Sequence, residues 1–324
     1  MTRISQVLSL LLAVQLLIAA AVFWPKQDRG DQDARAAILA LETEAIDRID
    51  ISDGDSSVQL ARSGGGWILP EYFSLPVATS RVDKVLKDLP SQRRGWPVAS
   101  SDSAVTRFEV DEASYQRRVG FYSADTLAGE IFLGSSPGFR KVHSRPGGDR
   151  QVYAIEFSSF ELPTTNTDWL DKSLLQVDAS ITSLTGLDFR LTPSDGDTWA
   201  AEDGTVAAAE EVNKLINGLT SLRVTGAADP ATTEMLAQMD VPANLRVSTD
   251  AGDYEFRQFE IEDAYYIQRS DIPVFFSISA FDHDRLNTVS AVSLFEAASE
   301  PSGSADIDAN AEAVSTLDGP ETEG

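Results

Sequence analysis

The chain has 324 residues, with 26 lysines and arginines against 51 aspartates and glutamates, so its formal net charge is 26 − 51 = −25. Such an acidic chain repels phosphate backbones, which argues against nucleic-acid binding. It has no cysteine and two histidines, which excludes disulfides, thiol catalysis and thiolate metal sites. With 42% apolar residues, it is long enough for two domains that each bury a core.

An uncharged apolar run opens the chain between Arg3 and Lys26. A helix over residues 4–24 would measure about 31 Å, which matches the hydrocarbon core of a bilayer. We therefore expect a single transmembrane anchor there, after a short cytoplasmic N-terminus at residues 1–3. A cleaved signal peptide is the alternative, because the alanines at 19–21 fit a small-residue cleavage site. Both interpretations place the rest of the chain outside the cytoplasm.

After an expected stalk at residues 25–44, one sequence pattern occurs twice, at a distance of about 130 residues. The matched positions are Leu60 with Leu191, Trp67 with Trp199, Val82 with Val212, Val85 with Leu215, Leu86 with Ile216, and Leu89 with Leu219. In each copy the last four positions have the spacing of one apolar helix face. Residues 80–89 and 209–219 are therefore predicted to form equivalent amphipathic helices.

Short runs with alternating apolar residues follow each predicted helix, as expected for strands of an antiparallel meander. They cover residues 115–122, 127–134, 139–145 and 150–157 in the first copy, and 244–249, 253–261, 264–270 and 272–279 in the second. The sequence thus predicts an α+β fold in which two tandem, homologous modules each pack antiparallel strands against an amphipathic helix.

These patterns also set the expected boundaries. The first module covers residues 45–165, a linker follows at 166–179, and the second module covers 180–290. From residue 296 to the end there are eight acidic residues and no basic one. A segment of that composition cannot bury enough apolar surface to order itself, so residues 296–324 are predicted to be disordered.

Asp282, His283 and Asp284 form the only cluster of metal-ligand residue types. Neighbouring residues of a helix point apart and no second histidine lies nearby, so the sequence favours a polar surface turn over a metal site. His143 lies in the other predicted meander and has no counterpart in the second copy. Neither histidine belongs to a catalytic motif. Both are expected to be exposed polar residues, so replacing both by glutamine is expected to leave the fold and partner binding nearly unchanged.

Two kinds of glycine turn suggest other sites. The glycines at 64–66 lack the lysine and hydroxyl residue of a phosphate-binding loop, so a tight turn is predicted. Residues 52–56 and 194–198 both contain Asp-Gly-Asp, but they hold different places in the repeat and lack the spacing of a calcium-binding EF-hand. Two independent turns are the expected result.

The aromatic residues offer the last candidates. Trp67 and Trp199 could stack on a sugar, but their shared place in the repeat favours a role in the core. Tyr265 and Tyr266 cannot both face inward on one strand, which makes them the candidates for an exposed aromatic surface. We predict no catalytic, cofactor-binding or metal-binding residue.

Four short motifs connect the chain to a known family. They are residues 60–67 with their glycine turn and tryptophan, 131–134 ending in Leu-Gly, 151–155 with Val-Tyr, and 168–172 with Trp-Leu-Asp-Lys. With the N-terminal apolar run, residues 1–290 resemble the domain of unknown function numbered 4340. The resemblance implies no catalytic residues, and it implies a relation to auxiliary subunits of gliding-type ABC transporters that act outside the membrane.

The expected function follows from this resemblance: a non-enzymatic accessory protein of an ABC transporter, with the permease and ATPase subunits as partners. It would be held in the inner membrane by its N-terminal helix, with both modules in the periplasm. The alternative is an envelope hydrolase acting on carbohydrate or peptide, or a ligand-binding receptor, that uses carboxylates.

Overall fold

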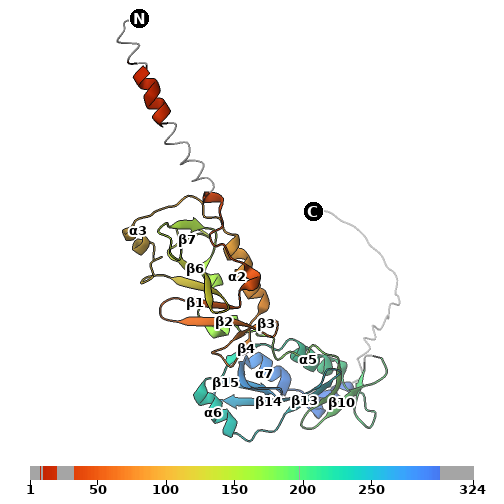
Figure 1. Cartoon of the computed structure of the whole chain (residues 1–324). Coiled ribbons are helices and arrows are strands. Elements are labelled where there is room, and N and C mark those ends of the chain that lie inside the picture. Colours follow the sequence, from red (N-terminus) through yellow and green to blue (C-terminus); the bar gives the residue numbers. More distant parts are fainter. Residues whose placement is uncertain (1–7, 9, 20–32, 197, 300–324) are drawn as a thin grey trace, which may run out of the picture.

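The computed structural model describes residues 8, 10–19, 33–196 and 198–299 and shows two α+β lobes (Figure 1). The upper lobe holds an antiparallel sheet of eight strands in the order β4-β3-β2-β1-β5-β6-β7-β8. Its strands are β1 (Arg48–Ser52), β2 (Ser57–Ser63), β3 (Gly66–Leu69), β4 (Leu75–Pro76), β5 (Arg117–Ser123), β6 (Thr126–Leu133), β7 (Val142–Pro146) and β8 (Tyr153–Ile155). Its helices are η1 (Thr43–Ala45), α2 (Thr79–Ser91), α3 (Asp102–Arg107), η2 (Ser159–Glu161) and α4 (Asn166–Trp169).

The lower lobe holds a second antiparallel sheet of eight strands, in the order β11-β10-β9-β13-β14-β15-β16-β12. Its strands are β9 (Ile181–Thr185), β10 (Arg190–Pro193), β11 (Trp199–Ala200), β12 (Val224–Ala227), β13 (Leu245–Thr249), β14 (Asp253–Ile261), β15 (Ala264–Arg269) and β16 (Ile272–Ile278). Its helices are α5 (Ala209–Thr220), α6 (Pro230–Gln238), α7 (Ala280–Asn287) and α8 (Ala291–Ser299). The predicted α+β class with antiparallel strands is confirmed.

The two sheets share one arrangement. Seven strands of each lie in the same order, from β3 to β8 in the first and from β11 to β16 in the second. The carbonyl oxygen of Trp67 accepts a hydrogen bond from the amide of Val77, and that of Trp199 accepts one from Ala207, each at 2.8 Å. The chain therefore turns from a strand toward the long helix of each lobe in the same way.

Apolar residues at helical spacing bind α2 and α5 to the core. In α2 the buried residues include Val85 and Leu89, and in α5 they include Leu215 and Leu219. Trp67 is buried and Trp199 is half-buried against the same core. This core is a single cluster that contains residues of both sheets.

The segment between the lobes joins them tightly. Trp169 of α4 is fully buried, and its indole donates a hydrogen bond to the carbonyl oxygen of Pro163 at 2.9 Å. Three residues later, the carbonyl oxygen of Lys172 accepts from the amide of Val224 on β12 at 3.0 Å. The hydroxyl of Tyr72, in the upper lobe, accepts from the amide of Ala227 on the same strand at 2.7 Å. The motif at 168–172 is thus the joint between the lobes.

Parts of the predicted anchor at 4–24 and of the tail at 296–324 lie outside the described residues. Within the former, residues 10–19 are helical and expose their apolar side chains. None of the helices that the structure describes has the length and hydrophobicity to span a membrane. Ile38 and Leu39, from the segment expected to be a stalk, are buried in the core of the upper lobe.

Candidate functional site

A groove of about 530 Å³ runs beside α2 in the upper lobe, a volume typical of sites that hold ligands. Three segments enclose it. They are α2 with Lys84 and Asp88 and the next residue Gln92, the β6–β7 loop with residues 139–141, and the segment with residues 156–158 and Glu161. These segments are distant in sequence, so the groove is a product of the fold.

The β6–β7 loop is a closed turn that presents an aromatic ring. The amide of Lys141 donates to the carbonyl oxygen of Gly138 at 3.2 Å, and the Ser136 hydroxyl lies 2.7 Å from the carbonyl oxygens of both residues. At its tip, Phe139 is 89% exposed, and the guanidinium of Arg140 lies 5.4 Å from the centre of its ring. A large exposed aromatic side chain on a hydrogen-bonded turn beside a groove has the properties of an anchor for a binding partner.

Across the groove from this loop, the lining combines an apolar residue at the bottom with charged residues of both signs. Phe157 is buried beneath the groove. Lys84 of α2 forms an ion pair with Glu161 of η2 at 2.6 Å, which connects the two walls. Asp88 and Glu156 add negative charge. A groove of this kind suits a peptide segment with both apolar and charged side chains.

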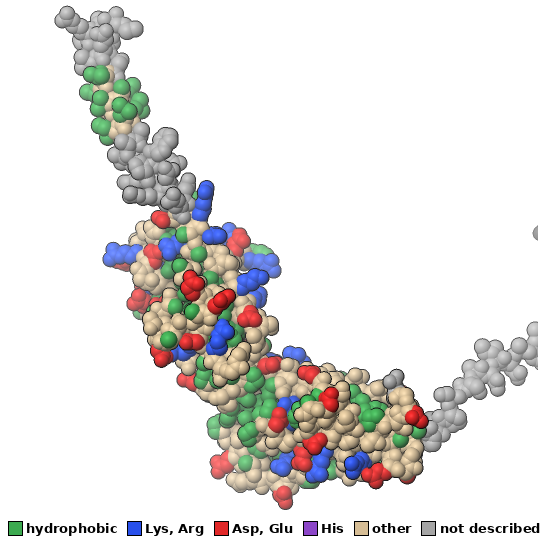
Figure 2. Space-filling model, turned by 45° about the vertical axis from the view of Figure 1, so that its right-hand side comes forward, with side chains coloured by type: hydrophobic (Ala, Val, Ile, Leu, Met, Phe, Trp, Pro, Cys, Tyr) green, Lys and Arg blue, Asp and Glu red, His purple; other side chains and the backbone are tan. Residues whose placement is uncertain are grey.

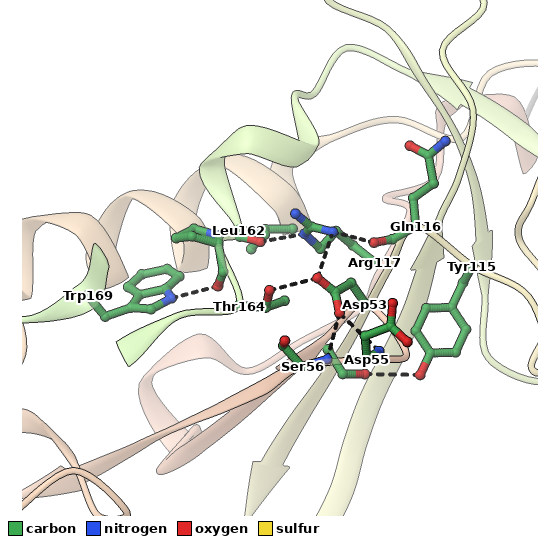
Figure 3. A network of polar contacts seen from close by, with 11 residues as sticks. Asp53, Asp55, Ser56, Tyr115, Gln116, Arg117, Leu162, Thr164 and Trp169 are labelled. Atoms are coloured by element: carbon green, nitrogen blue, oxygen red, sulfur yellow. Dashed lines mark hydrogen bonds and ion pairs between the residues drawn. The ribbon is translucent and has the colours of Figure 1, made fainter. Parts of the chain in front are cut away.

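A network of polar contacts holds the segment that follows this wall (Figure 3). The Nε of Arg117 donates to the carbonyl oxygen of Leu162 at 2.8 Å. The hydroxyl of Thr164 donates to the carboxylate of Asp53 at 2.8 Å, and that carboxylate also lies 3.6 Å from Arg117. The turn between β1 and β2 is thereby connected to the segment between η2 and α4.

Asp53 is the electrostatic centre of this network. Hydrogen bonds to its carboxylate lower its pKa below the usual value, and the largest contribution comes from the amide of Ser56 at 2.8 Å. Thr164, the amide of Asp55 and the charge of Arg117 act in the same direction, while burial opposes them. The turn at residues 52–56 therefore uses its first aspartate to stabilise the fold. In the other Asp-Gly-Asp turn, Asp197 lies outside the described residues.

A second, polar hollow of about 260 Å³ lies on the outer face of the upper sheet, around Gly120. Its lining includes Asp50, Gln59, Glu71, Arg118 and Tyr122. A side chain at Gly120 would press against the ring of Tyr122, at 3.0 Å from the Cβ position. Arg118 is hydrogen-bonded to Glu130 at 2.7 Å, and that bond is the main cause of its raised pKa. The hollow thus brings two carboxylates, Asp50 and Glu71, to one surface.

The interpretation of residues 282–284 as a polar surface turn is wrong. Asp282 and His283 lie in α7 and are buried. The ring of Tyr265 covers that of His283 at 4.5 Å between centroids, and Asp282 forms an ion pair with Arg285 at 3.2 Å. In the part of the chain that the structure describes, no group of three or more His, Cys, Asp or Glu side chains could hold a metal ion.

The expectation that His143 is an exposed residue is also wrong. It lies on β7 and is buried, with its ring stacked on Phe108 at 4.0 Å and its Nδ1 3.1 Å from the hydroxyl of Ser135. Burial is the main reason why the pKa of His143 is lowered, and the charge of Arg107 acts in the same direction. The structure separates the two histidines into different lobes, and each packs against an aromatic ring.

The structure also shows where the glycine turn and the two candidate tyrosines lie. Gly64 and Gly65 have φ values of +58° and +89° in the turn between β2 and β3, as a tight turn requires. Tyr265 and Tyr266 are both half-buried, Tyr265 against α7 and Tyr266 against the Phe259–Phe275 pair. Neither tyrosine forms a free aromatic surface.

Sequence analysis missed the groove because it assigned residues 139–145 to a strand. The strand β7 begins only at Val142. Pro137 and Gly138 stand directly before Phe139, and such a dipeptide is a turn signal that could have placed the phenylalanine in a loop.

Comparison with known proteins places the chain in a family. The model of the family described as "Domain of unknown function (DUF4340)" matches residues 67–246, which is more than half of the chain. The matched stretch begins at the buried Trp67 and includes α2, the β6–β7 loop and the joint between the lobes. No curated protein and no solved structure matches the chain. The chain therefore belongs to the family of the domain of unknown function numbered 4340.

Proposed function

We propose that the protein is a non-enzymatic, membrane-anchored accessory subunit that binds an ABC transporter of the gliding type outside the cytoplasm. The family resemblance suggests the transporter, and the groove beside α2 offers the binding site. The observation that carries the proposal is Phe139, a phenylalanine at the tip of a hydrogen-bonded turn with 89% of its surface exposed beside that groove.

The proposal includes attachment to the membrane. The run at residues 4–24 has no charged residue, and its described helical part exposes apolar side chains that a lipid environment would cover. These side chains are Leu8, Leu10, Leu11, Leu12, Val14, Leu16, Leu17 and Ile18. We expect the protein to stay in the membrane fraction at its full mass after alkaline extraction. Release of a mature chain starting near Val22 would favour the signal peptide instead.

Binding through Phe139 has a physical basis. Burial of a whole phenylalanine side chain contributes on the order of 2 kcal/mol, and anchors of this kind carry much of the energy of protein interfaces. Lys84 and Asp88 on α2, Lys141 on the β6–β7 loop and Glu156 on the third segment give the groove charges of both signs that a partner can match.

The test is co-purification of the full chain from membranes, followed by identification of the bound proteins. We expect a permease and an ATPase subunit with the wild-type chain, and their loss with Phe139→Ser. Leu187→Ser is the matched control, because Leu187 is 72% exposed but lies in the lower lobe. Equal melting temperatures of the variants will show that folding is intact. Absence of transporter subunits from the wild-type sample would reject the proposal.

The proposal also includes the origin of the two lobes: modules 45–165 and 180–290 are homologous copies. The shared order of seven strands and the equivalent backbone bonds at Trp67 and Trp199 support it. An experimental structure should superpose the two Cα traces in sequence order, with Trp67 over Trp199 and Val85 over Leu215.

A second function, as a receptor or hydrolase that uses carboxylates, is favoured by the polar hollow around Gly120. Asp50 and Glu71 both line it, and paired carboxylates can bind or hydrolyse sugars. Incubation with envelope glycans and peptides, for the wild type and for Asp50→Asn, tests this function. Binding or turnover that is lost in the variant would support it, and no binding by the wild type would reject it.

A further inference from the structure

We propose that the loop at residues 93–98 is a second membrane contact, in which the side chain of Trp96 lies among the lipid headgroups. The inference rests on the membrane attachment proposed above and adds to it a defined orientation of the upper lobe.

The two ends of α2 show which end of the upper lobe carries this loop. At its N-terminal end, the amide of Ala78 donates to the carbonyl oxygen of Trp169 at the joint with the lower lobe. At its C-terminal end, the carbonyl oxygen of Gln92 accepts from the amide of Ile38 at 2.7 Å. The 13 residues of α2 separate these ends by about 20 Å. The loop at 93–98 therefore lies at the end of the lobe remote from the joint (Figure 1).

The same loop is paired with the first described segment that follows the apolar run. The amides of Arg94 and Gly95 donate to the carbonyl oxygens of Ala36 and Ala34, each at 3.0 Å. The guanidinium of Arg93 donates to the carbonyl oxygen of Arg35 at 3.0 Å. These bonds fix the loop beside the point where the chain enters the lobe.

Chain length limits how far this point can be from the bilayer. Trp24 ends the apolar run and Ala34 is bonded to the loop, so ten residue steps separate them. A fully extended chain covers at most about 3.6 Å per residue, or roughly 36 Å here, and any other conformation is shorter. The loop is thus within reach of the headgroup region of the membrane that holds residues 4–24.

The exposed side chains of the loop have the chemistry of an interfacial anchor. Trp96 is 61% exposed and Val98 is 48% exposed, with Pro97 exposed between them. Arg35 and Arg93 are exposed beside them, and Figure 2 shows Lys and Arg side chains at this end of the upper lobe. Tryptophan prefers the membrane interface and arginine favours anionic headgroups. This combination of an exposed tryptophan with neighbouring arginines favours a lipid surface as the occupant.

The absence of cysteine from the sequence allows a direct test. Trp96→Cys in the full chain is labelled with an environment-sensitive fluorophore and reconstituted into vesicles of phosphatidylcholine and phosphatidylglycerol. We expect a blue shift of the emission relative to detergent, and quenching by nitroxides attached to the lipid headgroups. Leu187→Cys is the control, and its label should show neither effect.

The outcomes separate this inference from the attachment on which it rests. A chain that is retained in the vesicles after alkaline extraction, but whose label at position 96 is quenched no more than at 187, overturns the loop contact alone. A chain that is extracted from the vesicles overturns the attachment. A label at 96 that responds only when a transporter permease is also reconstituted would assign the loop to a protein partner and overturn the lipid contact.

Discussion

Gly134 shows how a single residue of a family motif is determined by the backbone around it. A Cβ atom there would lie 1.9 Å from the carbonyl oxygen of Phe108 and 2.4 Å from that of Glu109. Such contacts cannot be relieved by rotating a side chain, so Gly134→Ala should lower the free energy of unfolding by about 3 kcal/mol or more. Gly138→Ala is the control, because no atom lies within 4 Å of its Cβ position. Urea denaturation measures the free energy of unfolding of both variants. Similar losses of stability in the two would refute the explanation.

His143 makes stability depend on pH. Its pKa is lowered in the folded state, mainly by burial, whereas the unfolded chain binds the proton near pH 6.5. The neutral side chain therefore contributes its full stability above that pH, and the contribution is lost as the pH falls toward the folded pKa. Between pH 7.5 and 5.5, His143→Gln should lose less stability than the wild type. Equal losses in both proteins would contradict this assignment.

The error about the histidines has a physical origin. The spacing of apolar residues in the repeated pattern correctly predicted buried positions such as Trp67 and Val85. The partners of His143 and His283 are aromatic rings on other elements, Phe108 and Tyr265. A residue type that is polar in sequence becomes buried when a ring from a distant strand or loop covers it, and no local pattern records that contact.

Elements with a long apolar face were the ones that sequence could predict. The helices α2 and α5 and the strand β14 lie where their spacing placed them. The strand β12 and the helix α6 were missed. β12 has four residues including a glycine, and only Leu236 of α6 is buried. Short edge elements are determined by the neighbour they pair with, here β16, rather than by their own periodicity.

The Asp53 network joins the turn between β1 and β2 to the segment between η2 and α4, which is distant in sequence. Asp53→Asn removes the charge that binds Thr164 and Arg117, so it should cost about 1 to 3 kcal/mol at pH 7. Because the pKa of Asp53 is lowered, the wild type keeps this advantage above about pH 4 and loses it as the pH falls through the folded pKa. Chemical denaturation of the wild type and of Asp53→Asn, at pH 7 and at a pH below the folded pKa of Asp53, measures how the difference in free energy of unfolding changes.

The control for this network is Asp55→Asn. Only the backbone amide of Asp55 bonds to Asp53, and its side chain is exposed. Its cost should stay within about 0.5 kcal/mol. A cost equal to that of Asp53→Asn would mean that the turn, and not its connection to Thr164, determines the effect.

At the scale of the whole molecule, the shared core predicts one cooperative unit. Trp169 lies in a cluster that includes residues of both sheets. Trp169→Ala should therefore cost about 3 to 5 kcal/mol and lower the stability of both lobes together. Hydrogen exchange of β5 and β14 in the full chain measures each lobe, and Leu187→Ala is the exposed control. Loss of protection in one lobe alone would show that the lobes unfold independently.

The bonds at the start of the two long helices have a consequence for synthesis. The amide of Ala78, directly before α2, is bonded to the carbonyl oxygen of Trp169, and the amide of Ala208, directly before α5, is bonded to that of Leu294 at 2.8 Å. Each lobe is thus closed by the last residues of its own stretch of chain, and the upper lobe has been synthesised before most of the lower lobe has left the ribosome. The first lobe can then begin to fold on emergence and present the carbonyl oxygen of Lys172 to the amide of Val224 on β12, whose strand partner is β16.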